Sequence, residues 1–280
     1  MNSKLKIGGC VVLYNPDVDV LDNISTYIDV VEELIIVDNS SKKAIFLESL
    51  EEISKIKYVF MNGNKGIASA LDRGIRILHN DGFDVALTMD QDSKFPQKYV
   101  EDITAILNEK FYLYSVIGLN FNNNSVFKSD EIKDVSCWLT SGNFVKIDDY
   151  INIGGFYKEL FIDYVDIEYG YKLHKNGKRI GYLINYSLEH KIGNPIEINI
   201  LGFRCYAMNH TSIRYYYRYR NSFYLFLNEG NFFRTYFLKE MFINIPKMLF
   251  FEPDKIPKIK MLSKGLYDAY NGTLGVYKDK

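Results

Sequence analysis

A chain of 280 residues with 47% hydrophobic and 25% charged side chains has a globular composition and is long enough for one large domain with an appendage. Its 34 basic and 35 acidic residues nearly cancel, which disfavours nucleic-acid binding through a global field. The three cysteines, Cys10, Cys137 and Cys205, lie far apart without CxxC spacing, which argues against a zinc site or a disulfide framework.

The chain carries no obvious export or membrane-spanning signal. Its first residues lack the apolar run of a signal peptide, and no stretch of about 18 uncharged apolar residues occurs anywhere. We therefore expect a cytoplasmic protein.

The first half alternates short β-branched runs with stretches of helical period, which predicts an α/β fold with βαβ units around a mostly parallel sheet. The expected strands are residues 7–13, 34–37, 58–61 and 85–89. The expected helices are residues 68–78, where apolar side chains recur at spacings of three and four, and residues 96–108.

The second half has a different pattern. The polar segment 120–130 predicts an exposed loop, and residues 164–175 are helix-like. A basic, aromatic run at 214–221 precedes an apolar segment that extends to residue 251. Charged residues interspersed in this segment favour an interfacial or partner-packing helix over a membrane-spanning helix. We expect one large domain at 1–230, made of two halves at 1–120 and 121–230, followed by a helical extension at 231–280.

Each expected strand of the first half ends in polar residues. These ends carry Tyr14 and Asn15 after the first strand, Asp38 at the second, Asn64 and Gly66 after the third, and Asp90, Gln91 and Asp92 after the fourth. Ligands of open α/β sheets bind at the carboxyl ends of the strands, so this pattern predicts a nucleotide pocket.

Asp90 and Asp92 are the strongest feature of that edge. Two carboxylates separated by one residue can both bind one Mg²⁺ or Mn²⁺ ion, which would neutralise charge on a departing diphosphate. The plainer alternative is a solvated loop or a helix cap. Asp38 has a similar pair of interpretations, a turn residue or an acceptor of hydrogen bonds from a base or ribose.

Several ordered motifs resemble the family 2 glycosyltransferases, and within them the bacterial rhamnosyltransferase-like branch. The motifs are Val12-Leu13-Tyr14-Asn15-Pro16, Ile36-Val37-Asp38-Asn39-Ser40-Ser41, Asn64-Lys65-Gly66-Ile67-Ala68 with Gly74, Leu87-Thr88-Met89-Asp90-Gln91-Asp92-Ser93, Thr140-Ser141-Gly142, Gly154-Gly155-Phe156, Asp163-Tyr164-Val165-Asp166-Ile167-Glu168 and His190-Lys191-Ile192-Gly193. They run through nearly the whole chain.

The resemblance implies a GT-A fold, a nucleoside-diphosphate sugar donor, a divalent metal and single-displacement transfer with inversion. It implies that residues near Tyr14 and Asp38 hold the nucleobase and ribose, and that Asp90 and Asp92 hold metal and diphosphate. It places His190 near the metal, although a lone histidine is more often structural. It also places Arg220 near the donor phosphates, although the run around it could equally be a buried tyrosine-rich helix or a stacking surface.

Asp166 matches the catalytic base of the family. The physical requirement agrees, because an inverting transfer needs one carboxylate to accept the proton of the acceptor hydroxyl. Asp163, Asp166 and Glu168 could instead merely favour the start of a helix, and the two neighbouring acids leave the choice among them open.

Two positions depart from the family pattern. Asp72 stands where asparagine is more frequent, and Lys172 stands where arginine is usual. Neither change removes a reactive group, but residues on the helix of Asp72 border the cleft and bear on the choice of donor.

Other enzyme classes fit less well. A nucleotidyltransferase should carry a glycine-rich triphosphate loop after the first strand, and a dehydrogenase should carry GxGxxG there, but neither occurs. The remaining alternatives are a UDP-hexose donor in place of dTDP-L-rhamnose, and a non-catalytic sugar-nucleotide-binding protein of the same fold. By the resemblance, residues 1–120 form the nucleotide-sugar half and residues 121–230 the acceptor half. The expected acceptor is a lipid-linked saccharide. Residues 242–264 would suit docking to the inner face of the cell membrane, or they could pack on the domain or form a homodimer contact.

Overall fold

The computed structural model describes residues 4–121, 131–190, 195–200 and 203–279. The chain forms two compact units, one of Met1–Lys158 with Asp166–Lys191 and the other of Glu159–Val165 with Ile192–Lys280. Residues 122–130 of the expected loop and residues 191–193 of the His190 motif lie outside the described residues.

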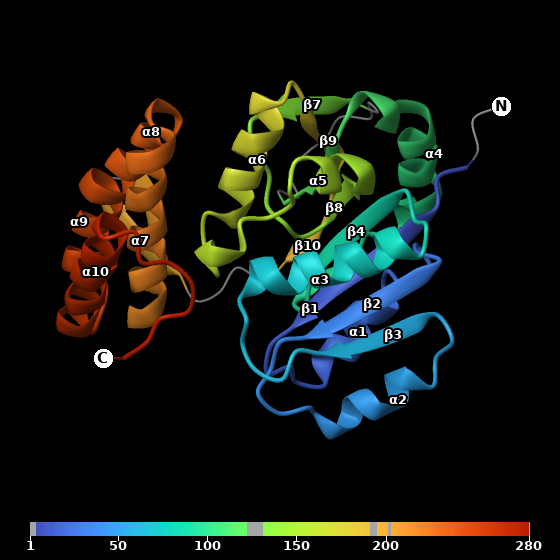
Figure 1. Ribbon diagram of the computed structural model, residues 1–280, viewed down its shortest axis with the longest axis horizontal. Helices are drawn as coiled ribbons and strands as arrows, with labels where there is room; N and C mark the ends of the chain where they lie inside the picture. Colours follow the sequence, from blue (N-terminus) through green and yellow to red (C-terminus); the bar gives the residue numbers. More distant parts are fainter. Residues whose placement is uncertain (1–3, 122–130, 191–194, 201–202, 280) are drawn as a thin grey trace. The chain divides into compact units, whose positions relative to one another are not determined.

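An eight-stranded sheet forms the centre of the first unit, in the order β3-β2-β1-β4-β8-β6-β9-β7 (Figure 1). The strands β3, β2, β1 and β4 are parallel, β8 runs antiparallel to β4 and β6, β9 is parallel to β6, and β7 is antiparallel to β9. Their bounds are β1 (Ile7–Leu13), β2 (Glu33–Asp38), β3 (Ile56–Phe60), β4 (Val85–Asp90), β6 (Val116–Asn120), β7 (Ile132–Val135), β8 (Asn143–Lys146) and β9 (Ile180–Ser187). The α/β prediction and its four strands are confirmed.

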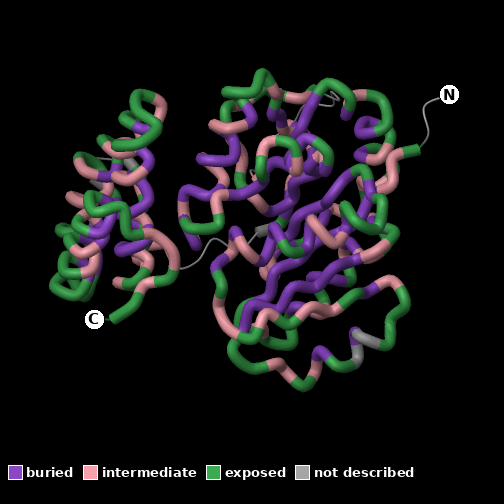
Figure 2. Tube along the Cα trace, in the orientation of Figure 1, coloured by how far each residue is buried: buried purple, intermediate pink, exposed green. Residues whose placement is uncertain are grey.

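Helices cover both faces of this sheet, because successive side chains of a buried strand point to opposite sides. On one side Val11 and Leu13 of β1 pack in a core with Val20 and Ile24 of a helix, α1 (Asp19–Ser25), and with apolar residues of α4 (Val100–Lys110). On the other side α3 (Ile67–Asn80) approaches β1 closely at Gly74. The central strands are buried along their length (Figure 2).

The remaining helices of the first unit are short. They are α2 (Glu48–Glu51), α5 (Ile147–Asn152) and α6 (Val165–Lys175), with single turns of 3₁₀ helix at Ile45–Leu47, Gln97–Tyr99, Phe111–Leu113 and Lys158–Leu160. The expected helix at 96–108 begins as one of these turns and becomes α-helical at Val100, because Pro96 leaves the preceding backbone extended or turned.

The second unit is a helical bundle with a two-stranded sheet of β11 (Ile196–Ile200) and β12 (Phe203–Ala207). Its helices are α7 (Ser212–Glu229), α8 (Asn231–Lys239), a π-helical turn at Glu240–Asn244, α9 (Ile245–Phe251) and α10 (Lys255–Tyr270). Tyr215 and Tyr219 of α7 pack against Met248 and Leu262. Tyr216 and Tyr217 pack against Phe161.

The two compact units do not divide at residue 230, and the expected domain assignment stays a prediction. Helix α7, which falls within residues 1–230, lies in the second unit. The reason is its packing with α10, since a side chain at Gly265 would meet the backbone oxygen of Tyr216 at 2.5 Å. A pair of helices this close shares one core.

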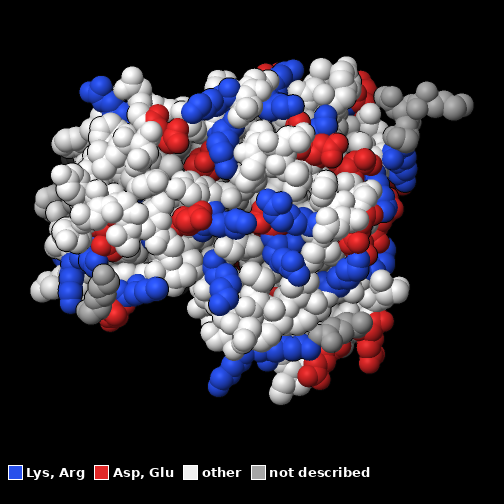
Figure 3. Space-filling view, in the orientation of Figure 1, with Lys and Arg blue, Asp and Glu red and all other residues white. Residues whose placement is uncertain are grey.

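Charge is mixed over the surface. On the face drawn in Figure 3, Lys and Arg side chains are interspersed with Asp and Glu, in keeping with the net charge of −1. Within the described residues, no helix has both the length and the apolar content needed to cross a bilayer.

Candidate active site

The four polar strand ends meet at one edge of the sheet. Leu13 at the end of β1 is level with Asp38 at the end of β2, and Asp38 is level with Phe60 at the end of β3. On the other side of β1, Val12 is level with Asp90. The chain leaves β1 in one direction along the sheet and returns to its opposite side as β4, so this edge contains the topological switch point at which open α/β sheets bind ligands.

Tyr14 and Gln91 join the ends of β1 and β4. The backbone N–H of Tyr14 donates to Oε1 of Gln91 at 2.8 Å, and Nε2 of Gln91 donates to the carbonyl of Tyr14 at 3.3 Å. Gln91 thereby binds the backbone of the neighbouring loop, and Tyr14 is 48% exposed.

Asn15 and Asp38 are tied to the loop after β2. Asn15 takes a left-handed backbone conformation with φ of 45°, and its N–H donates to Oγ of Ser40 at 2.7 Å. The carboxylate of Asp38 accepts from the N–H of Ser40 at 2.9 Å and from the hydroxyl of Tyr58 at 2.5 Å. Asp38 is fully buried. These contacts show its turn-forming role, and its role toward a nucleotide stays a prediction.

Asn64 and Gly66 shape the entry to α3. Oδ1 of Asn64 accepts from Nδ2 of Asn39 at 3.1 Å and from the N–H of Gly66 at 3.0 Å, and Oδ1 of Asn39 accepts from the N–H of Lys65 at 2.8 Å. Gly66 has φ of 87°, which only glycine adopts without cost, and α3 begins at the next residue. The amino end of α3 therefore opens next to the strand ends, with orphan N–H groups suited to phosphate.

The Asp90-Gln91-Asp92 turn is held by its backbone. The N–H of Asp90 donates to Oγ of Ser141 at 3.0 Å, and that hydroxyl donates to Oγ of Ser93 at 2.8 Å. Nδ2 of Asn23 donates to the carbonyl of Gln91 at 2.7 Å. These partners bind the main chain of the turn, and Asp90 and Asp92 are partly exposed residues at the edge of the sheet.

His190 lies beside this turn along the backbone. It belongs to β10 (Glu189–His190), which pairs antiparallel with β5 (Ser93–Lys94), so that His190 is opposite Ser93. Its side chain is outside the described part of the structure. Among the residues that are described, no three His, Cys, Asp or Glu side chains gather closely enough to hold a metal by themselves. The carboxylates of Asp90 and Asp92 are the ligand type that Mg²⁺ and Mn²⁺ prefer, and the other ligands of such ions are phosphate oxygens and water.

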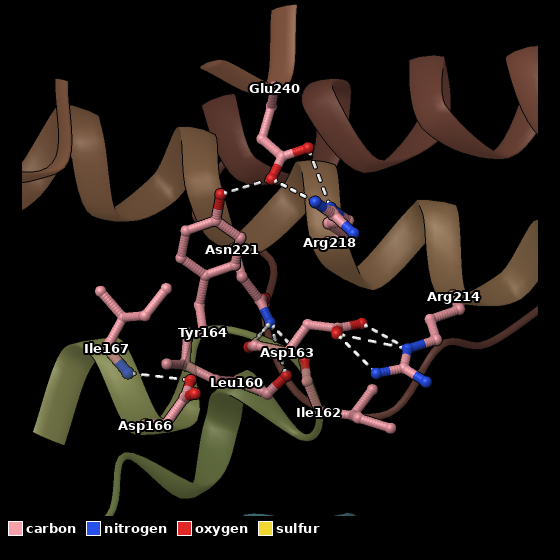
Figure 4. Close-up of polar contacts among 10 residues, drawn as sticks. All are labelled: Leu160, Ile162, Asp163, Tyr164, Asp166, Ile167, Arg214, Arg218, Asn221 and Glu240. Atoms are coloured by element: carbon pink, nitrogen blue, oxygen red, sulfur yellow. Dashed lines mark hydrogen bonds and ion pairs between the residues drawn. The ribbon is translucent and has the colours of Figure 1, made fainter. Parts of the chain in front are cut away.

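Asp166 is the second residue of α6, and its Oδ1 accepts a hydrogen bond from the N–H of Ile167 at 2.9 Å (Figure 4). The two neighbouring acids are paired with cations. Asp163 makes a bidentate ion pair with Arg214 at 3.0 to 3.3 Å, and Glu168 is buried, with Lys172 at 3.3 Å. Asp166 is partly exposed in the first turn of α6, and its role as the base stays a prediction from the resemblance.

Aromatic contacts connect α6 to α3 within the first unit. The ring of Tyr169 lies 4.8 Å from Phe156 and 5.5 Å from Tyr150. The hydroxyl of Tyr150 in turn donates to Oδ1 of Asp72 on α3 at 3.0 Å. The helix that carries Asp166 is thus braced against the helix that follows Gly66.

Arg220 lies in the core of the second unit with no exposed surface. Its guanidinium donates to the carbonyls of Glu159, Leu160 and Gly275 and to Oδ1 of Asn221. These contacts favour a structural role, and donor binding by Arg220 stays a prediction.

Some residues that support the site were not recognised from the sequence patterns. Asn23 and Tyr58 were given no role, although they hold Gln91 and Asp38. A signal for Asn23 exists, since it is a buried amide between the apolar Val20 and Ile24 on a short helix. Ser141 was noted within a motif without a role.

Comparison with known proteins shows the family to which this chain belongs. The sequence pattern described as Glycosyl transferase family 2 matches residues 10–158, which is more than half of the chain. The chain belongs to glycosyl transferase family 2. The matched residues of this glycosyltransferase include every polar strand end of the site, whereas Asp166, His190 and Arg220 lie beyond the match.

Relatives of the glycosyltransferase agree with this placement. It is 24% identical to the "dTDP-rhamnosyl transferase RfbF" of Shigella flexneri, over 99% of this chain and 97% of that protein. The expected rhamnosyltransferase-like character is therefore supported. Among solved structures, S. aureus TarS 1-349 in complex with UDP-GlcNAc gives a TM-score of 0.63 at 14% identity, over 96% of this chain and 82% of TarS 1-349.

A second solved structure, GalNAc-T7 with UDP, GalNAc and Mn²⁺, gives a TM-score of 0.63 at 11% identity, over 96% of this chain and 55% of GalNAc-T7. At such identities these likenesses establish the fold alone, and the GT-A expectation is confirmed.

Proposed function

We propose that this glycosyltransferase moves L-rhamnose from dTDP-L-rhamnose to a saccharide acceptor with inversion at the anomeric carbon. The observation that carries the proposal is the shared edge of the sheet, where Asp90 and Asp92 lie beside the ends of β1, β2 and β3. A nucleotide bound along these ends would have its diphosphate near the two carboxylates and the amino end of α3.

Asp90 and Asp92 would hold Mg²⁺ or Mn²⁺, with His190 as a further candidate ligand. The metal, when bound, supplies positive charge against the diphosphate that leaves. The contacts of Ser141 and Asn23 fix the main chain of the turn that carries both carboxylates.

Asp166 would act as the general base. Its carboxylate would accept the proton of the acceptor hydroxyl while the hydroxyl oxygen bonds to the anomeric carbon and the bond from that carbon to the diphosphate oxygen breaks. The nucleoside diphosphate leaves on the opposite face, so one displacement inverts the centre. Asp163 and Glu168 are paired with Arg214 and Lys172. The choice of Asp166 rests on its match to the base of the family and on its place in the first turn of α6.

The choice of dTDP-L-rhamnose rests on the relative named a dTDP-rhamnosyl transferase, which matches almost the full length. The runner-up donor is a UDP-hexose, because the solved neighbours include complexes with UDP and UDP-GlcNAc. Donor choice depends on a few contacts in the pocket, which a 24% identical relative need not share.

We also propose that the second unit docks on the inner, cytoplasmic face of the cell membrane, near a lipid-linked acceptor. Between residues 231 and 270, the acids Glu240, Glu252 and Asp268 are buried and Asp254 is exposed. The bases at least partly exposed there are Arg234, Lys239, Lys247, Lys255, Lys260 and Lys264. Large apolar side chains are exposed in the same segment, among them Phe242, Phe250 and Ile256. Exposed aromatic and basic side chains together suit an anionic lipid surface.

Replacement of the base tests the proposed chemistry. We expect Asp166→Asn to abolish both rhamnosyl transfer to polyprenyl-diphosphate-linked saccharides and the slow release of dTDP by transfer to water, with the dissociation constant for dTDP nearly unchanged. Asp148→Asn is the matched control, because Asp148 is an exposed second residue of another helix, α5. Retention of most of the turnover by Asp166→Asn would show that the base is wrongly assigned.

A further inference from the structure

The segment Glu159–Val165, here called the strap, leads directly into α6 and has a strained backbone. Phe161, Asp163 and Tyr164 have φ of 68°, 60° and 67°, although none of them is glycine. A residue with a Cβ in this left-handed region costs about 1–2 kcal/mol, so three within four positions are stable only where neighbouring groups hold them.

Asn221 is the main group that holds the strap. Its Nδ2 donates to the carbonyls of Leu160, Ile162 and Asp163 at 2.9, 2.7 and 2.9 Å (Figure 4). Asn221 is fully buried, so no water can replace these bonds. One side chain thus binds three carbonyls of the strap.

Arg220 orients that amide. Its Nε donates to Oδ1 of Asn221 at 3.0 Å. This hydrogen bond keeps the amide oxygen toward Arg220 and the amide nitrogen toward the strap. Its Nη2 donates to the carbonyls of Glu159 and Leu160 at 3.1 and 3.0 Å. The two adjacent residues of α7 together bind four of the strap carbonyls.

The strained side chains are held as well. Asp163 is paired with Arg214, and the ring of Phe161 stacks on Tyr217 with 4.6 Å between centroids. The hydroxyl of Tyr164 donates to Oε1 of Glu240 at 2.9 Å. Burial raises the pKa of Tyr164 and the charge of Glu240 raises it further, so this hydroxyl stays protonated as a donor.

The strap ends where α6 begins. Val165 is the first residue of α6 and Asp166 the second, so the backbone angles at Asp163 and Tyr164 set the direction in which the helix and its carboxylate start. A change of these angles toward ordinary values would rotate the first turn of α6. A displacement of about 1 Å at a reacting group can cost about 100-fold in rate.

We propose that Asn221, oriented by Arg220, is a positioning residue that keeps the strap in its strained conformation and thereby aims Asp166 at the acceptor hydroxyl. This inference rests on the proposed function of Asp166. It assigns Asn221 of the basic, aromatic helix α7 a role on the acceptor side of the reaction.

The test is Asn221→Ser in the full chain. We expect kcat for rhamnosyl transfer to polyprenyl-diphosphate-linked saccharides to fall about 30-fold or more, while the dissociation constant for dTDP changes less than about threefold. The matched control is Asn228→Ser on the same helix, where Nδ2 donates only to the carbonyl of Tyr224 one turn earlier and the side chain is exposed. The control should retain the activity of the unmodified protein.

A second control separates positioning from loss of stability. Tyr215→Phe removes a buried hydrogen bond to Glu252 at 2.8 Å in the same unit, away from the strap. We expect this variant to lower the unfolding midpoint without lowering kcat. Equal losses of kcat in Tyr215→Phe and Asn221→Ser would overturn the proposal, because any weakening of the helical unit would then suffice.

A milder variant covers the case in which Asn221→Ser does not fold. Arg214→Gln breaks the partly exposed pair with Asp163 and should lower kcat about three- to tenfold with unchanged dTDP binding, whereas Arg234→Gln, at an exposed position of α8, should not. Unchanged kcat in Asn221→Ser and Arg214→Gln, together with an inactive Asp166→Asn, would overturn the positioning role alone. An active Asp166→Asn would instead overturn the proposed function.

Discussion

At the scale of single residues, Asp72 shows how a departure from the family pattern is accommodated. The carboxylate has little exposed surface, yet it accepts from Arg76 at 2.9 Å, from Lys158 at 3.1 Å and from the hydroxyl of Tyr150 at 3.0 Å. Burial alone would raise the pKa of Asp72, but the hydrogen bonds from Arg76 and Lys158 outweigh it, and the pKa lies below its ordinary value. Asp72 is therefore a charged brace between α3 and the aromatic cluster of Tyr150.

We predict that Asp72→Asn lowers the free energy of unfolding at pH 7 by about 1 kcal/mol, because both cations are partly exposed and regain water. Since the folded-state pKa is lowered, the contribution of the charge is complete above the unfolded pKa of about 4 and is lost as the pH falls through the folded-state value. Urea unfolding of both proteins from pH 7 to pH 3 should show the difference shrinking. A constant difference would mean that the charge of Asp72 contributes nothing.

Some site residues could be predicted from the sequence and others could not. The strand-end residues could be chosen from the sequence, because a polar side chain that directly follows a buried β-branched run lies at the carboxyl end of a strand. The ion pair of Asp163 with Arg214 could not be predicted, because Arg214 is 51 residues away from Asp163. In sequence, Arg220 resembles a surface phosphate ligand, but its partners are carbonyls that no pattern reveals.

At the scale of elements, the contact of α3 with β1 depends on Gly74. A Cβ at Gly74 would lie 2.2 Å from Sγ of Cys10 and 3.3 Å from Cγ2 of Val37. The absence of a side chain therefore lets the helix that follows the Gly66 turn approach the strand that leads to Tyr14. The spacing of two site loops depends on this approach.

We predict that Gly74→Ala lowers the free energy of unfolding by about 1–3 kcal/mol through overpacking. Cys10→Ala removes the nearest atom, so the double variant should lose less than the sum of the single losses by about 0.5 kcal/mol or more. Ser69→Ala, at a partly exposed position of α3, is the control and should change stability little. Additive losses in urea unfolding would contradict the close approach.

Elements differ in how far sequence predicts them. The strands of the first half and α3 were predicted within a few residues, because the strands are continuous β-branched runs and α3 has apolar residues at spacings of three and four. The strands β8, β6, β9 and β7 were not, because their order depends on long-range pairing. Helix α7 was seen as a basic, aromatic run, but its pairing with α10 depends on a glycine 45 residues beyond Arg220.

At the scale of the whole molecule, the composition of the second unit predicts behaviour at a lipid surface. We expect the protein to sediment with phosphatidylglycerol vesicles at low salt and to be released by high salt, because basic side chains supply much of the attraction. Phe242→Ser with Phe250→Ser should weaken binding about fivefold or more, since both rings are exposed. Tyr112→Ser, at an exposed ring of the first unit, is the control.

Absence of vesicle binding would contradict membrane docking. If, in addition, the protein forms dimers that the paired phenylalanine substitutions dissociate, the exposed apolar side chains serve a homodimer contact instead. The sequence alone did not decide between a membrane and a second copy of the chain, because an amphipathic segment can bind either one.

The central claim is that the shared strand edge binds a nucleotide through a metal held by Asp90 and Asp92. The most direct measurement is calorimetric titration of the protein and of Asp92→Ala with dTDP and with UDP, in Mg²⁺ or Mn²⁺ and again in EDTA, with the exposed Asp102→Ala as control. We predict metal-dependent binding with dTDP preferred, weakened about tenfold by Asp92→Ala in metal and unaffected by it in EDTA. Preference for UDP would change the donor to a UDP-hexose, whereas binding of neither nucleotide, or binding indifferent to EDTA and to Asp92→Ala, would contradict the claim.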